Sequence, residues 1–183
     1  MQRPRARTLW LALVITALVV VVGFAVEREL APRAAVAPMV FWQGIPQPRA
    51  LSAEEEAYAE ALWPIHSQVV ETSAVAMSSA GVSYVTEHHD TARLAEAARS
   101  LHDTFQSATH KARALAVPNS IQRVRDQYLG ALALFETASE EMAKVGEDGK
   151  VDHLIAAQAM SQRAAEGLLI VGDVLWPGEH KPN

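Results

Sequence analysis

The chain has 183 residues, half of them hydrophobic, with a formal net charge of −5 and no cysteine. Without cysteine there can be no disulfide, no thiol catalysis and no covalent c-type haem, and the redox compartment is left open. The net charge is −8 once the three arginines within the first seven residues are set aside. Such an acidic chain argues against nucleic acid as a partner, because binding to phosphates rewards patches of Lys and Arg.

An unbroken apolar run without a charge extends over Leu9–Val26. A helix of this length reaches about 27 Å, close to the hydrocarbon thickness of a bilayer. Because backbone groups in lipid must be satisfied internally, the run predicts one transmembrane helix over residues 8–26. The basic tip, residues 1–7, favours a cytoplasmic N-terminus and places the rest of the chain outside, in a periplasmic or extracellular location.

A cleaved signal peptide is the alternative to this single-pass anchor. The apolar run is longer than the usual signal-peptide core of about 7–15 residues, which favours an uncleaved signal anchor. Gly23-Phe24-Ala25 nevertheless offers a small-x-small cleavage site, whereas Pro38 should block processing at Ala35-Val36-Ala37. We therefore expect an anchor and leave cleavage open.

A proline-rich linker is predicted over residues 27–51. Its four prolines forbid a continuous helix and favour extended conformations. Phe41 and Trp42 lie in its one strongly apolar patch, which does not belong in a free spacer. We expect them to pack on the following domain, with a position at the membrane interface as the alternative.

The first of four predicted helices begins after Ser52 and extends to about residue 88. Ser52 and Glu55 have the spacing of a capping box, and Pro64 predicts a kink or the first turn of a longer segment. Recurrence every seven residues predicts the buried face, formed by Trp63, Val70, Met77 and Tyr84. A second stripe of small and hydroxyl residues either lets another helix approach closely or faces water: Thr72, Ala76, Ser79, Ser83 and Thr86.

Three further helices follow with more regular patterns. The second begins at its N-cap Asp90 and ends near Val117, the third follows residues 118–120 and stops at Gly146, and the fourth covers residues 151–175. Glu147–Lys150 is predicted as a turn and residues 178–183 as a polar tail. The third helix has the clearest seam, with Ile121, Tyr128, Phe135 and Met142 alternating with Val124, Ala131, Ala138 and Val145.

These patterns predict an all-α fold. Four helices joined by short turns give an up-down-up-down antiparallel four-helix bundle over residues 52–177 with coiled-coil-like seams. One anchor followed by an outside bundle resembles the ligand-sensing part of chemoreceptors and sensor kinases in architecture only. Those proteins normally carry a second span and a cytoplasmic output domain, and no family motif is matched.

The predicted topology gathers aromatic residues at the end of the bundle where the linker attaches. Leu62-Trp63-Pro64 and Leu175-Trp176-Pro177 are the same tripeptide and both fall at this end. Phe41 and Trp42 can join Trp63 and Trp176 there. We favour an aromatic plug that closes the core, and the alternative is a surface for a partner protein or for the membrane interface.

The opposite end gathers histidines and carboxylates from two turns: His88, His89, Asp90, Asp148, Asp152 and His153. Imidazole and carboxylate groups are ligands for zinc, copper or nickel. Ligand type without tight spacing is a weak signal, however. Asp90 and Asp152 are also suitable N-caps, and polar turns are expected at a solvated tip, so we favour the structural explanation over a metal site.

The sequence predicts no enzyme and no cofactor. No Glu has a His three residues later, as a di-iron bundle requires, and neither a zinc-protease motif, a nucleophile elbow nor a phosphate-binding glycine loop occurs. We expect a membrane-anchored extracytoplasmic bundle that acts through protein–protein contacts, as an accessory, assembly or structural subunit of an envelope or membrane complex. Self-association is left open. The alternative function is a module that binds or senses a small ligand or metal.

Overall fold

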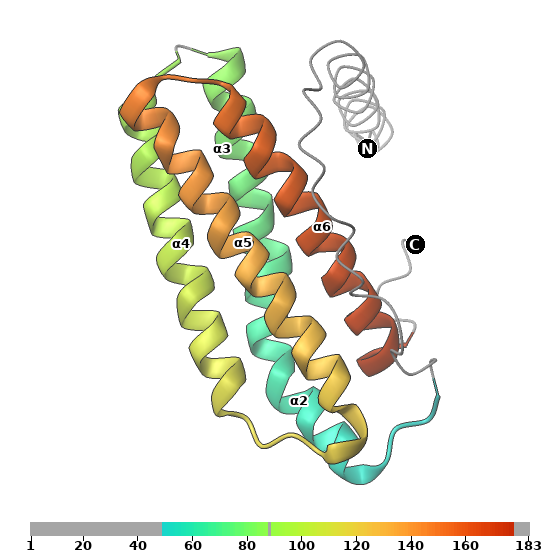
Figure 1. Cartoon of the computed structure of the whole chain (residues 1–183). Helices are drawn as coiled ribbons and strands as arrows, with labels where there is room; N and C mark the ends of the chain where they lie inside the picture. Colours follow the sequence, from blue (N-terminus) through green and yellow to red (C-terminus); the bar gives the residue numbers. More distant parts are fainter. Residues whose placement is uncertain (1–48, 88, 178–183) are drawn as a thin grey trace, which may run out of the picture. The chain divides into compact units, whose positions relative to one another are not determined.

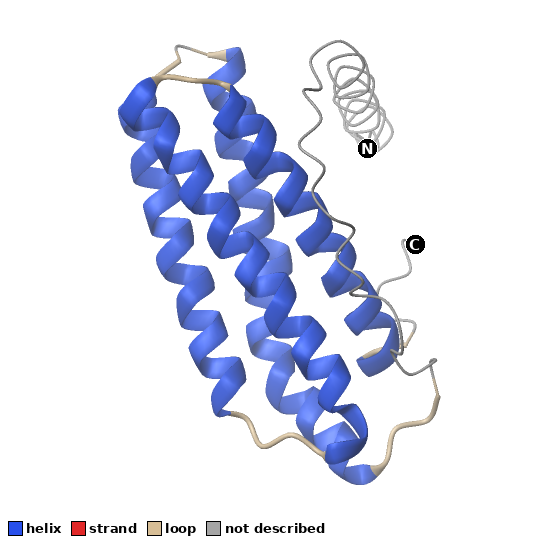
Figure 2. Ribbon diagram, viewed as in Figure 1, coloured by secondary structure: helices blue, strands red, loops and turns tan. Residues whose placement is uncertain are grey.

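The computed structural model describes residues 49–87 and 89–177, and within these ranges the chain consists of helices and loops without a strand (Figures 1 and 2). The predicted anchor, the basic tip, linker residues 27–48 and the polar tail lie outside the described residues. Among the helices that are described, none is long and apolar enough to cross a membrane. The elements are α2 (Ala53–Ser67), the π-helix η1 (Gln68–Ala74), α3 (Val75–Thr86), α4 (Thr91–Ala114), the 3-10 turn η2 (Asn119–Ile121), α5 (Gln122–Asp148) and α6 (Asp152–Leu175).

The predicted helical bundle is confirmed. Elements α2, η1 and α3 follow one another without a break and form the first rod, and each later helix runs opposite to the one before it (Figure 1). Helix α5 packs along both α4 and α6, whereas the first rod makes fewer contacts with its neighbours. The first rod is therefore the least tightly integrated of the four.

The seam predicted for the third helix is confirmed as core, and its neighbours bury facing residues. Phe105 and Phe135, on facing helices, are fully buried and stacked with ring centroids 4.8 Å apart. Burying a side chain of this kind contributes about 1.5–3 kcal/mol. Every predicted seam position of α5 is buried, as are Leu94, Ala98, Leu101, Ala108 and Ala112 of α4 and Leu154, Ala157, Ala164, Leu168, Val171 and Leu175 of α6.

The predicted seam of the first rod is correct only in its second half. Met77 and Tyr84 are buried, but upstream the core positions are Leu62 and Val69, whereas Trp63 is 36% exposed. The π-helix η1 explains the difference, because its wider turn inserts one extra residue. The spacing from Val69 to Met77 is therefore eight residues instead of seven. Pro64 lies inside α2, four residues before η1 begins.

Two predicted helix ends are corrected. Helix α5 does not stop at Gly146 but continues to Asp148, and Gly149 supplies the left-handed cap with φ +72°. Gly146 lies within the helix, where an added Cβ would be 2.5 Å from the Cβ of Ala95 on α4. Its small size thus serves a close helix approach rather than a turn. Helix α4 ends at Ala114, before the expected Val117.

Candidate functional site

An aromatic cluster forms where the second half of α2 meets the end of α6. Trp63 of α2 meets Trp176, the residue after α6, edge to face with ring centroids 5.1 Å apart. His66, one turn after Trp63 and 1% exposed, has its ring 4.6 Å from that of Trp176 and 5.9 Å from that of core residue Tyr128. The structure therefore brings the two Leu-Trp-Pro segments together. We call Trp63, His66 and Trp176 the tryptophan cluster. Phe41 and Trp42 lie outside the described residues.

A buried carboxylate joins three segments at the end of the bundle where α2 begins. The Glu55 side chain is 1% exposed and accepts hydrogen bonds from Arg49 Nη1 over 2.8 Å, from the Ser52 backbone N–H over 2.7 Å and from Ser120 Oγ over 2.7 Å. The Arg49 guanidinium, followed by the Ser52 and Ser120 donors, holds the pKa of Glu55 well below its usual range. The side chain thus ties the incoming chain and the α4–α5 connection to the first turn of α2.

Local spacing in the sequence predicts only part of this carboxylate's role. The capping box of Ser52 and Glu55 is confirmed. The partners Arg49 and Ser120 were missed, since Ser120 lies 65 residues away and no spacing rule relates it to Glu55. Its position within η2, on the connection between α4 and α5, is visible only once the bundle is built.

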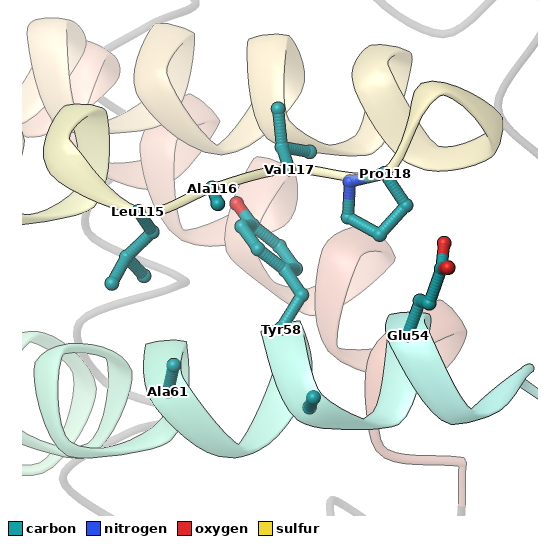
Figure 3. A pocket seen from close by; sticks show the side chains of 8 residues that line it. Glu54, Tyr58, Ala61, Leu115, Ala116, Val117 and Pro118 are labelled. Atoms are coloured by element: carbon teal, nitrogen blue, oxygen red, sulfur yellow. The ribbon is translucent and has the colours of Figure 1, made fainter.

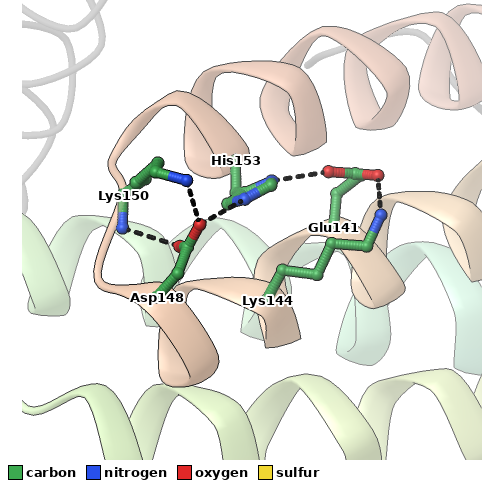
Figure 4. Close-up of polar contacts among 5 residues, drawn as sticks. All are labelled: Glu141, Lys144, Asp148, Lys150 and His153. Carbon is green, nitrogen blue, oxygen red and sulfur yellow. Dashed lines mark hydrogen bonds and ion pairs between the residues drawn. The ribbon is translucent and has the colours of Figure 1, made fainter.

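At the opposite end, His153 links the last turns of α5 to the first turn of α6 (Figure 4). Its Nδ1 lies 2.8 Å from Glu141 Oε2 and its Nε2 lies 3.4 Å from Asp148 Oδ2. Glu141 also pairs with Lys144, and Lys150 Nζ lies 2.7 Å from Asp148 Oδ2. The charges alternate in sign along the group, so each side chain stabilises its neighbour.

These pairings shift the pKa values in the directions that favour the charged forms. The hydrogen bond to Glu141, followed by that to Asp148, raises the pKa of His153 above its ordinary value. Hydrogen bonds from Lys150 lower the pKa of Asp148 to about 2, and Lys144 lowers that of Glu141. A protonated imidazole donates from both nitrogens and has no lone pair left for a metal.

The other residues of the predicted metal site have separate structural roles or lie apart from His153. Asp90 is the N-cap of α4, as predicted, and accepts from the Arg93 N–H over 2.9 Å. Asp152 is not an N-cap, because α6 is preceded by Val151 without a capping side chain. The His89 ring packs edge to face on that of Tyr84, with centroids 5.4 Å apart. His88 lies outside the described residues, and among those described no three histidines and carboxylates are arranged to hold a metal ion.

Helix α3 presents an exposed face without charge. Between Glu71 and Glu87 the sequence has no charged residue, and exposed fractions are 57% for Val75, 45% for Val82 and 54% for Val85. The hydroxyls on this surface donate to backbone carbonyls of the helix itself, over 2.8–3.1 Å, and so present little unsatisfied polarity. We call the α3 face the set of Val75, Ser78, Ser79, Val82, Val85 and Thr86.

The stripe of small and hydroxyl residues on the first rod was predicted either to let another helix approach closely or to face water. Thr72, Ala76, Ser79 and Thr86 are exposed, and Ser83 is half-buried. The stripe therefore does not bring another helix of the same bundle close.

A groove of about 500 Å³ lies between α2 and the α4–α5 connection (Figure 3). Tyr58 forms its middle, and the tyrosine hydroxyl is buried without a hydrogen-bond partner among the described residues. Burial raises the pKa of Tyr58 to about 12. Besides Tyr58, only Glu54 has a polar side chain among the lining residues, so the groove offers no pair of nucleophile and base; the others are Ala57, Ala61, Leu115, Ala116, Val117 and Pro118.

Comparison of the chain with protein-family models, with curated proteins and with solved structures finds no match in any of the three. The class that the fold defines is a helical bundle.

Proposed function

We propose that the protein is an accessory or assembly subunit of a membrane complex, anchored by Leu9–Val26 and acting outside the cytoplasm through protein–protein contacts. The observation that carries this proposal is the uncharged α3 face, with three valines each about half exposed. Removing such a surface from water costs little, since no charge has to be desolvated. Exposed apolar surface of this kind marks interaction sites.

The proposed partner is a different protein that offers an uncharged helix of small and apolar residues. A charged partner residue would be desolvated against the valines without a counter-charge. A second copy of this chain fits less well, because both copies are acidic and the 12 residues of α3 give a helix only about 18 Å long. A stable interface needs about 800 Å² from each side, which a larger partner reaches by extending onto neighbouring helices.

A charge placed on the α3 face tests the contact. Val82→Glu should abolish a stoichiometric complex in detergent-solubilised membranes, measured as loss of one partner band and a smaller particle by light scattering. Gln106→Glu on the exposed side of α4 is the matched control and should keep the complex. The proposal is wrong if both variants, with unchanged melting temperatures, retain the complex, or if the lost species is a second copy of the chain.

The anchor and its orientation are tested with single cysteines, which the cysteine-free chain makes unambiguous. Cysteine at Gln106 should react in intact cells with a maleimide that cannot cross membranes. Cysteine at Gln2 should react only after permeabilisation, and the chain should resist alkaline extraction. Reaction of both sites, or of neither, in intact cells would contradict the proposed topology, and alkaline release would contradict the anchor.

A further inference from the structure

The tryptophan cluster presents an aromatic surface where α2 meets the end of α6. Trp63 is 36% exposed although its ring packs on Trp176, and Trp176 is itself only partly buried. Beneath them His66 is almost fully buried and its ring leads to Tyr128 in the core. A group bound to this surface would contact aromatic rings, which favours another aromatic side chain.

The chain that precedes the bundle begins its described path close to this surface. Arg49 is held by Glu55, and Leu51 packs against the core. Trp63 lies eight residues after Glu55, which corresponds to about 12 Å along α2. Six residues separate Trp42 from Arg49, and seven extended steps reach about 23 Å. In Figure 1 the described segment that leads into α2 begins on the side of the bundle where α6 ends.

We propose that Phe41 and Trp42 dock on the tryptophan cluster of their own chain. They are the only aromatic residues between the apolar run and Tyr58. A tether of six residues gives them an effective concentration in the millimolar range. Pro46 and Pro48 stiffen that tether, which reduces the entropy lost on docking. A separate protein would have to compete with this local concentration.

Docking would give the incoming chain two fixed points, one at Arg49 and one at Trp42. The tryptophan cluster would then be a covered surface, distinct from the α3 face that the proposed function uses. The inference is independent of that function, because it holds whether or not residues 9–26 span a membrane and whether or not a partner binds α3.

A double-mutant cycle in the full-length chain, kept in detergent micelles, tests the contact. Trp42→Ala should lower the melting temperature of the helical circular-dichroism signal. In the Trp63→Ala background the same substitution should lower it by less than half as much. With Val82→Ala, on the distant α3 face, the shift should be undiminished. The proposal is wrong if Trp42→Ala shifts the melting temperature equally in both backgrounds or not at all.

A cross-linking experiment identifies the occupant without truncating the cluster. Phe41 is replaced by the photoreactive aromatic residue benzoylphenylalanine in the full chain, and the cross-linked peptide is located by mass spectrometry. Links within one chain to residues 59–67 or 172–177 are expected. A dimeric product with the same peptides would assign the cluster to a second copy. Links to the far wall of the groove, residues 115–118, or to no part of the bundle, would also overturn the proposal.

Discussion

At Gly146, helices α4 and α5 approach each other so closely that there is no room for a side chain. A Cβ at this position would be 2.5 Å from the Cβ of Ala95 and 3.2 Å from the carbonyl oxygen of Thr91. Gly146→Ala should therefore destabilise the bundle by about 1–3 kcal/mol, as overpacking does, even though alanine is the better helix former. Chemical denaturation followed by circular dichroism measures the change.

The control for Gly146 separates crowding from backbone strain. Gly149 also resists substitution, but for its positive φ and not for lack of space, since nothing lies within 4 Å of an added Cβ. Ala95→Gly should thus recover part of the stability that Gly146→Ala loses. It should recover none of the stability that Gly149→Ala loses. Equal effects of Ala95→Gly in both backgrounds would show that the Ala95 contact is not the cause.

Residue roles that depend on local spacing could be predicted from the sequence, and those that depend on distant partners could not. The capping box at Ser52 and the N-cap at Asp90 are short-range hydrogen bonds, and both are present. Gly146 was interpreted as a stop signal because glycine ends helices. Its actual constraint comes from Ala95, 51 positions earlier, and no local pattern reports that contact.

At the scale of elements, the π-helix η1 corrects the phase of the first rod. Removing one exposed residue from it, Thr72, would restore the seven-residue spacing between Val69 and the next core position. We expect the deletion variant to fold cooperatively with a melting temperature within a few degrees of that of the unmodified protein. Its core side chains would keep their places while the wide turn becomes an ordinary α-helical turn.

A deletion in a regular helix is the matched control for η1. Removing the exposed residue Thr137 from the middle of α5 rotates every later core position by about 100°. This variant should lose cooperative unfolding. If the two deletions lower the melting temperature equally, the extra residue in η1 is not what aligns the core positions before and after it.

The hairpin of α5 and α6 should respond to pH through His153. The pKa of His153 is raised in the folded state above its ordinary value of 6.5, so the folded state favours the protonated form. The stabilisation is complete below about pH 6.5 and is lost as the pH rises through the folded-state pKa. The stability difference between the unmodified protein and His153→Gln should therefore shrink between pH 6 and pH 9 in thermal melts.

Matched measurements identify the origin of that pH dependence. The groups facing His153 are Glu141 and Lys144 from α5 and Asp148 and Lys150 near the turn, and all four keep their charge from pH 6 to 9. With Glu141→Gln and Asp148→Asn in the background, His153→Gln should show no such trend. A constant difference for His153→Gln over this range would contradict the assignment.

The elements themselves could be predicted wherever the heptad pattern is uninterrupted. The α5 seam has an apolar residue or alanine at every expected position, and each is buried. In the first rod the pattern of Trp63 and Val70 continued smoothly into Met77 and Tyr84. A strict repeat has no way to signal an inserted residue, so a competing apolar series at Leu62 and Val69 was overlooked.

At the scale of the whole molecule, the contacts of the bundle extend back to Arg49, ahead of the start of α2. A fragment of residues 49–177 should melt at a higher temperature than one of residues 51–177, because the shorter fragment leaves the buried Glu55 carboxylate without its guanidinium partner. Differential scanning calorimetry compares the two. Arg49→Gln in the longer fragment should match the shorter one, and equal melting of all three would contradict the role of Arg49.

The bundle was predictable as a whole because short turns between amphipathic helices leave few other arrangements. The structure also brings Trp63 and Trp176 together, which followed from helix direction alone. The α3 face was harder to interpret, since Val75 and Val82 have the same character as core residues. Only the packing of the other helices shows which valines are left outside.

The Glu55 carboxylate has a mechanical consequence. Tension applied to the chain ahead of Arg49 would reach α2 through a guanidinium bond to Glu55, and would pass at once to Ser120 on the α4–α5 connection. The load is shared between two rods at its point of entry, so peeling α2 away one turn at a time would first require this bond to break. An attachment of this kind allows a bundle to be pulled by the segment that precedes its first helix and to remain folded.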